Sequence, residues 1–340
     1  MMKGKKIIST TTICFVLFLL IMDAKTALNG AKEGLTMCIA VVIPSLFPFL
    51  VISALLPGRF MGRKIPAFGI LNRVCGIPKG AESLLILGFL SGYPAGATMI
   101  ADAYQHGRLT KSSANRLMGF CSNAGPAFLF GMVGALFPQK SSVWLLWLIH
   151  IITALLVGAV LPQSEDYSCR LRKKAPTTLP QALEKAIKTM ANICGWVIIF
   201  RIILTILNRW VLWLLPKEAQ ACIWGIMELS NGITYLHNLD GSGIRFVLSS
   251  AFLAFGGLCV GMQTVSVTKD LGLGQYFPGK VLHCLFSILI ASVVQYGLFS
   301  PEACVHFPYI FYIALTFGII LIIFLLQKKK SSSISEASVV

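Results

Sequence analysis

Residues 82–103 read ESLLILGFLSGYPAGATMIADA, an apolar segment that is long enough to enter a membrane but is interrupted at its centre by Ser91-Gly92-Tyr93-Pro94-Ala95-Gly96. Proline cannot continue a helix, and the glycines supply a turn. A second apolar segment, 219–237, is broken by Glu228-Leu229-Ser230-Asn231-Gly232. We therefore predict two re-entrant hairpins, because non-helical backbone at membrane depth survives only where protein or a wet cavity surrounds it.

The composition is that of a membrane protein. Of the 340 residues, 56% are hydrophobic and only 12% are charged, and the mean hydropathy is +0.78. In soluble proteins about a quarter of the residues are charged. The long, continuous apolar runs exclude a transmembrane β-barrel. The low share of charged residues excludes soluble enzymes, disulfide scaffolds and disordered proteins. We predict an all-α, polytopic transmembrane helical protein.

Besides the two hairpins, eight apolar runs approach the length of about 20 residues that a spanning helix needs. They lie near 7–22, 35–56, 114–137, 141–162, 190–215, 244–267, 281–300 and 307–327. The first run follows Lys3, Lys5 and Lys6, so a cleaved signal peptide is the alternative for it.

The basic residues sort by membrane side if both hairpins return to the side they entered. Of the 29 Lys and Arg, 22 then fall on the cytoplasmic side, Arg116 and Lys280 among them, and 6 fall outside. Arg201 remains inside a span. This bias satisfies the positive-inside rule, places both termini in the cytoplasm and explains the net charge of +16 without a nucleic-acid partner.

The two halves of the chain match weakly but in order. Residues 37–47 align with 190–200, Gly88 with Gly225, and 120–125 with 252–257. A chance match between glycine-rich membrane segments is the alternative. Because the charge pattern places the first hairpin inside and the second outside, the match predicts an inverted repeat, an architecture of secondary transporters.

The predicted organisation follows from these boundaries. It comprises an N-terminal transmembrane anchor (1–30), a first repeat (31–162), a basic cytoplasmic linker (163–189), a second repeat (190–300), a C-terminal transmembrane helix (301–330) and a disordered tail (331–340).

Polar groups at the breaks are the candidate ligands for a solute. They are Ser91, Gly92, Tyr93, Pro94 and Gly96 in the first hairpin, Ser122 and Asn123 in the run 120–127, Glu228 and Asn231 in the second hairpin, and Gln263 after the second glycine-rich break. Two alternatives remain open. The glycines four residues apart can serve helix packing, and Asn123 can join helices by hydrogen bonds.

Arg201 and Glu228 are the basic and acidic side chains predicted at membrane depth. Charges there are costly, so they face the protein interior and pair. We predict an Arg201–Glu228 ion pair beside Asn231. It is either purely structural or part of the mechanism.

Other chemistry is not expected. The ten cysteines contain no CxxC, and the chain has no GxxxxGK[ST], HExxH or GxSxG motif. We therefore expect no enzyme activity, no metal site and no cofactor. His150 and His283 lie within spans and are expected to be buried and hydrogen-bonded.

Residues 91–134, SGYPAGATMIADAYQHGRLTKSSANRLMGFCSNAGPAFLFGMVG, resemble the signature of the sporulation integral membrane protein YlbJ family, which is part of the Gate or nucleoside-recognition group. IPSLFPFLV at 43–51 and GIMELSNGI at 225–233 stand in the expected order on either side. The resemblance implies a protein needed for endospore formation, with a domain shared by nucleoside transporters and ferrous-iron transporters. It leaves the substrate open.

We expect a multi-pass protein of the cell membrane that transports, or forms a channel for, a small polar solute, either nucleoside-like or ionic. Its expected partners are that solute, the lipid bilayer, and a second copy or other sporulation membrane proteins. The rival hypothesis is a non-transporting scaffold that assembles or localises sporulation proteins.

Overall fold

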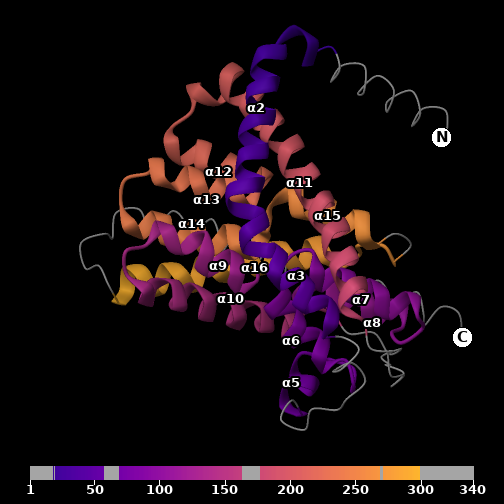
Figure 1. The fold of residues 1–340 in the computed structure, drawn as a ribbon. Coiled ribbons are helices and arrows are strands. Elements are labelled where there is room, and N and C mark those ends of the chain that lie inside the picture. The colour runs from indigo at the N-terminus through magenta and orange to yellow at the C-terminus, as the bar shows by residue number, and fades with distance from the viewer. Residues whose placement is uncertain (1–17, 19, 57–68, 163–176, 269–270, 299–340) are drawn as a thin grey trace, which may run out of the picture.

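The computed structural model describes residues 18, 20–56, 69–162, 177–268 and 271–298, and these form helices and no strand (Figure 1). The all-α class is therefore confirmed for this part of the chain. The predicted run at 307–327, nearly all of the run at 7–22 and the predicted tail lie outside the described residues.

The same order of elements occurs twice. The first set is α2 (Ala24–Met37), η1 (Cys38–Val42), α3 (Ile43–Leu55), α5 (Gly69–Val74), α6 (Glu82–Ser91), α7 (Ala95–Gln105), α8 (Lys111–Cys121), α9 (Pro126–Gly131), η3 (Val133–Leu136) and α10 (Lys140–Val160). The second set is α11 (Leu179–Trp210), η4 (Leu212–Leu214), α12 (Lys217–Met227), α13 (Leu229–Tyr235), η5 (Leu236–Asn238), α14 (Ser242–Phe255), α15 (Gly257–Thr268), α16 (Tyr276–Ser292) and η7 (Val293–Leu298). Each set contains a long helix, a broken hairpin, a broken helix and a further long helix.

Five helical segments among the described residues are long and apolar enough to cross a membrane: Ala24–Leu55, Lys140–Val160, Leu179–Trp210, Ser242–Thr268 and Tyr276–Gln295. The predicted span at 114–137 is wrong. Helix α8 ends at Cys121, residues 122–125 carry no helix, and α9 begins at Pro126. Asn123, Gly125 and Pro126 explain the break, because all three favour turns over helix interiors.

The predicted linker also ends earlier than expected. Helix α11 begins at Leu179, where Thr178 and Gln181 form a capping box that satisfies backbone groups at both positions. The helix therefore contains the last residues of the segment 163–189. Arg201 consequently lies 22 residues from the start of α11, about 33 Å along its axis.

Helix α10 shows which surface meets lipid. Its exposed face is a stripe of large apolar residues at every fourth position, Trp144, Leu148, Ile152, Leu156 and Val160. Its polar His150 and Thr153 are buried instead. A helix that is apolar outside and polar inside suits a hydrocarbon environment, where polar groups turn toward the protein.

Corresponding helices of the two sets pack against each other in antiparallel directions. Along α2, Asp23 meets Trp210, Gly34 meets Ile198 and Cys38 meets Cys194, so the residue numbers rise on one helix and fall on the other. Gly30 and Gly34, four residues apart, let the backbones of α2 and α11 approach closely. In Figure 1, α10, α14 and α16 lie beside one another, and α2 crosses them with α11 alongside.

Candidate functional site

Both hairpin breaks and the break between α8 and α9 meet around one cavity. Its lining comprises Gly92 and Tyr93 from the first hairpin, Ala124, Gly125 and Phe128 from the break between α8 and α9, Glu228, Leu229 and Ser230 from the second hairpin, Val260 and Gln263 from α15, and Val42, Leu46, Ile193 and Val197 from the long helices. The cavity between these residues measures about 40 Å³. That is room for water, which needs about 10–15 Å³, and is smaller than the roughly 300 Å³ at which small-molecule pockets begin, so a larger solute requires the surrounding helices to separate.

The first hairpin reaches the cavity through a close approach of two glycines. Gly92 has a φ of +74°, and a side chain on Gly125 would stand 2.9 Å from the Gly92 backbone. A larger residue at either position would separate the hairpin from the α8–α9 break. The Tyr93–Pro94 peptide bond is cis, and the Tyr93 hydroxyl lies 3.3 Å from the Leu253 carbonyl oxygen, near the end of α14. The hairpin therefore connects both sets of helices.

The second hairpin is built around a buried carboxylate. Glu228 is 2% exposed and caps α13 by accepting the backbone N–H groups of Ser230 (3.0 Å) and Asn231 (2.7 Å). It also accepts the side-chain amide of Asn231 at 2.7 Å. These three donors stabilise a negative charge at the start of a helix.

The predicted Arg201–Glu228 ion pair is wrong in its partner. Arg201 forms its ion pair with Glu33 of α2, with 2.8 Å between the Nη2 and Oε2 atoms. It reaches Glu228 only through Asn231, whose Oδ1 accepts from Arg201 at 2.6 Å. Arg201 also lies over the Trp224 ring at 4.8 Å. Glu33 was not predicted as the partner because it lies just before the predicted span 35–56 and was therefore not placed at membrane depth.

Lys280 is a buried cation beside the cavity whose contacts were not predicted. It was counted as cytoplasmic, but it lies in α16, is 1% exposed and points into the first set of helices. Its ammonium donates to the Tyr93 hydroxyl (2.9 Å), to the Ser122 carbonyl oxygen and to Asn123 Oδ1 (3.3 Å). A polar stripe on α16, Lys280, His283 and Ser287 at positions i, i+3 and i+7, was the signal in the sequence.

Arg116 was counted as cytoplasmic for the same reason and is also buried, at 1% exposed. Its guanidinium donates to the carbonyl oxygens of Leu161 (2.7 Å) and Gly158 (2.6 Å) at the end of α10, and to that of Cys75 (2.7 Å). A cation at the carbonyl end of a helix stabilises it. We assign Arg116 to the fold rather than to the cavity.

The remaining candidates divide into two groups. Four of the ten predicted ligands line the cavity: Gly92, Tyr93, Glu228 and Gln263. The other six are buried beside it: Ser91, Pro94, Gly96, Ser122, Asn123 and Asn231. Asn123 uses its amide within the protein, donating to the Phe120 carbonyl at 2.7 Å and accepting from Lys280. Of the two alternatives, its contacts favour the structural one.

His150 and His283 are buried as predicted, and both are hydrogen-bonded. His150 Nε2 accepts the Ala124 backbone N–H at 3.2 Å, and His283 Nε2 lies 3.1 Å from the His150 carbonyl oxygen. The two rings stack with centroids 4.7 Å apart. They lie behind the cavity rather than in its lining.

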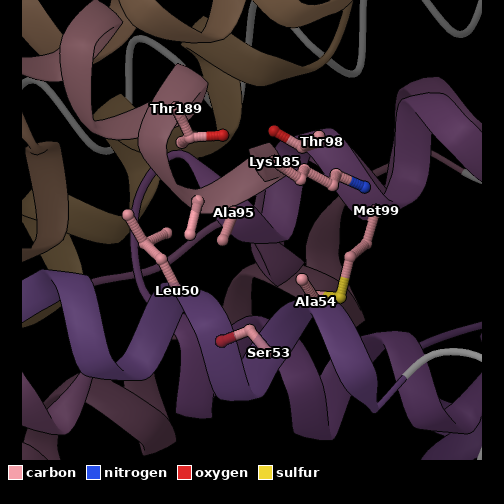
Figure 2. Close-up of a pocket in the computed structure, with 9 residues that line it drawn as sticks. Leu50, Ser53, Ala54, Ala95, Thr98, Met99, Lys185 and Thr189 are labelled. Atoms are coloured by element: carbon pink, nitrogen blue, oxygen red, sulfur yellow. The ribbon is translucent and has the colours of Figure 1, made fainter. Parts of the chain in front are cut away.

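A second cavity lies where α3, α7 and α11 meet, and none of the predicted ligands lines it. Figure 2 shows Leu50, Ser53 and Ala54 on one side and Thr98, Lys185 and Thr189 on the other. This cavity is bounded by continuous helices. The first cavity is bounded by three helix breaks, and we therefore take it as the functional site.

The fold and the site together define a polytopic helical membrane protein in which paired broken helices enclose a central cavity. Over 87% of its length, the chain is 25% identical to the sporulation integral membrane protein YlbJ of Bacillus subtilis (strain 168), of which the match covers 84%. This similarity confirms the resemblance to the YlbJ family. No family model matches the chain, and no solved structure matches it.

Proposed function

We propose that this protein is a transporter, or a channel-like protein, for a small polar solute and that it acts in the membrane during endospore formation. The observation that carries the proposal is the central cavity, because three helix breaks, drawn from both sets of helices, border it. Discontinuous helices that meet around a cavity are the arrangement by which secondary transporters expose backbone groups to their substrates. The process is inferred from the similarity to YlbJ, whose name states a role in sporulation.

An inverted repeat is part of this proposal. The antiparallel packing of α2 on α11 supports it, because a two-fold axis in the membrane plane relates helices of opposite direction. His150 and His283, 133 residues apart, stack on each other, as equivalent residues do beside a two-fold axis. With this repeat we propose that the first hairpin opens to the cytoplasm and the second outward, and that both termini are cytoplasmic.

The solute must suit a mixed site. The cavity presents one carboxylate, one phenol, one serine hydroxyl and one amide among apolar side chains. Such a lining fits an uncharged polar molecule of nucleoside type or a cation better than it fits an anion, because Glu228 repels negative charge. We propose no enzymatic step and no bound cofactor.

The test is uptake into vesicles that contain the purified protein, with nucleosides, metal ions and, as the anionic comparison, dicarboxylates. Val197→Phe enlarges a buried side chain of the cavity lining. Ile152→Phe makes a similar enlargement on the lipid-facing side of α10 and is the matched control. We expect saturable uptake that Val197→Phe abolishes and Ile152→Phe preserves, at equal amounts of protein per vesicle.

Absence of uptake for every solute, together with normal spore yield in a strain that carries Val197→Phe, would contradict transport. That pair of results would favour the scaffold hypothesis, because a scaffold does not need an open cavity.

A further inference from the structure

The ammonium group of Lys280 is enclosed by oxygen atoms that belong to the other set of helices. The side chain starts on α16 and ends against the Tyr93 hydroxyl, the Ser122 carbonyl and Asn123 Oδ1. An ammonium has three N–H donors, and these three oxygens accept all of them. The Tyr93 ring faces the same nitrogen at 4.9 Å from its centroid.

No carboxylate from the part of the chain that the structure describes takes part. Among the described residues, the ion pairs with Asp or Glu involve other cations, and none brings a carboxylate within 4.0 Å of Lys280. The positive charge is stabilised instead by dipoles. Ser122 is the C-cap that follows α8, a helix of 11 residues, so its carbonyl lies next to the negative end of the helix dipole.

The same set of atoms has the chemistry of a cation site. A carbonyl oxygen at the end of a discontinuous helix, an amide oxygen and a hydroxyl oxygen are hard, neutral ligands of the kind that coordinate Na⁺ in transporters with broken helices. Divalent cations require carboxylates to offset their charge, and this set has none. The chemistry therefore fits a small monovalent cation.

We infer that the Lys280 ammonium permanently occupies a site that would otherwise bind Na⁺ or Li⁺. Removal of the side chain leaves the three oxygens in place and converts the protein into one that binds such an ion. If the proposed function is correct, transport needs no Na⁺, because the cation that joins the two sets of helices is part of the Lys280 side chain.

Three variants test this by thermal unfolding of the purified protein in detergent. Lys280→Ala removes the ammonium and its chain and leaves room for an ion. Lys280→Met removes the charge but fills most of the space. Lys188→Ala, on an exposed position of α11, is the control for loss of a lysine. Each is measured in NaCl, LiCl and choline chloride at equal ionic strength.

We expect Lys280→Ala to unfold at a lower temperature than the wild type in choline chloride and to recover in NaCl or LiCl. An ion at ten times its Kd raises the ratio of folded to unfolded protein about elevenfold, which corresponds to a rise of about 2 °C in Tm for a chain of this length. Lys280→Met, Lys188→Ala and the wild type should show no difference between the three salts.

Two results would overturn the inference. One is a Lys280→Ala variant whose Tm is the same in all three salts. The other is a wild type that Na⁺ stabilises over choline, which needs no variant and remains informative if Lys280→Ala does not fold. Both measurements report ion binding in the absence of any solute. They therefore test this inference independently of the proposed transport function.

Discussion

The network around Arg201 leads to a prediction about stability. If Arg201 and Glu228 formed a direct buried pair, loss of either partner would cost about 3–5 kcal/mol and loss of both would restore much of it. The structure predicts a different result, because Asn231 lies between them and Glu33 is the ion-pair partner of Arg201. We expect Arg201→Met and Glu228→Gln to destabilise the protein nearly independently.

The magnitudes follow from the contacts. Arg201→Met removes the donor to the buried Asn231 Oδ1, at about 1–3 kcal/mol. Loss of the pair with Glu33, whose side chain is 51% exposed, adds at most about 1 kcal/mol. Glu228→Gln replaces a carboxylate that accepts three N–H groups, and loss of one such charge-assisted bond costs about 1.5–3 kcal/mol.

The assay is a double-mutant cycle on the free energy of unfolding in detergent. We expect a coupling between Arg201 and Glu228 below about 1 kcal/mol, and a larger one between Arg201 and Asn231, measured with Asn231→Leu. A double variant, Arg201→Met with Glu228→Gln, that is more stable than either single variant would refute this reasoning and restore the direct ion pair.

Three further predictions use single positions. Tyr93→Phe removes the oxygen that links Lys280 to the end of α14, and should lower Tm and solute uptake together; unchanged values would show that the hydroxyl has no role. Gly88→Ala places a Cβ atom 1.9 Å from the Cys121 carbonyl oxygen and should cost about 1–3 kcal/mol in unfolding free energy, whereas Gly195→Ala, with no neighbour within 4 Å, should cost nothing. Single cysteines at the exposed positions Gln105 and Asn238, in a background without the native cysteines, should react with a membrane-impermeant reagent from opposite sides, and labelling from one side would exclude the inverted repeat.

Both hairpin breaks could be predicted because local sequence determines them. Pro94 removes a backbone donor wherever it lies in a helix, and Gly92 adopts a backbone conformation that other residues avoid. The spans of α10 and α16 follow equally from continuous hydropathy. The broken span at 114–137 was missed because its mean hydropathy hides the four-residue interruption, although Asn123 and Pro126 were visible in it.

The partners of the buried charges could not be predicted, because they come from segments far apart in the chain. Glu33 and Arg201 are separated by 168 residues, and only the antiparallel packing of α2 on α11 brings them together. The spacing of residues in the sequence predicts which of them share a face of one helix. It does not predict how two packed helices are aligned along their axes. Arg201 was paired with Glu228 because Glu228 was the acidic residue predicted at membrane depth.

The burial of Lys280 shows what a charge count omits. The positive-inside rule counts cations near the ends of spans and treats each as solvated. Lys280 starts one turn inside α16, next to Gly279, which packs on Gly119 of α8 and brings the two helices close together. At that separation the lysine chain reaches the end of α8 instead of the membrane surface. His283 and Ser287 lie on the same buried face of α16. A polar stripe on an otherwise apolar span therefore indicates that Lys280 points inward, which its positive charge alone does not indicate.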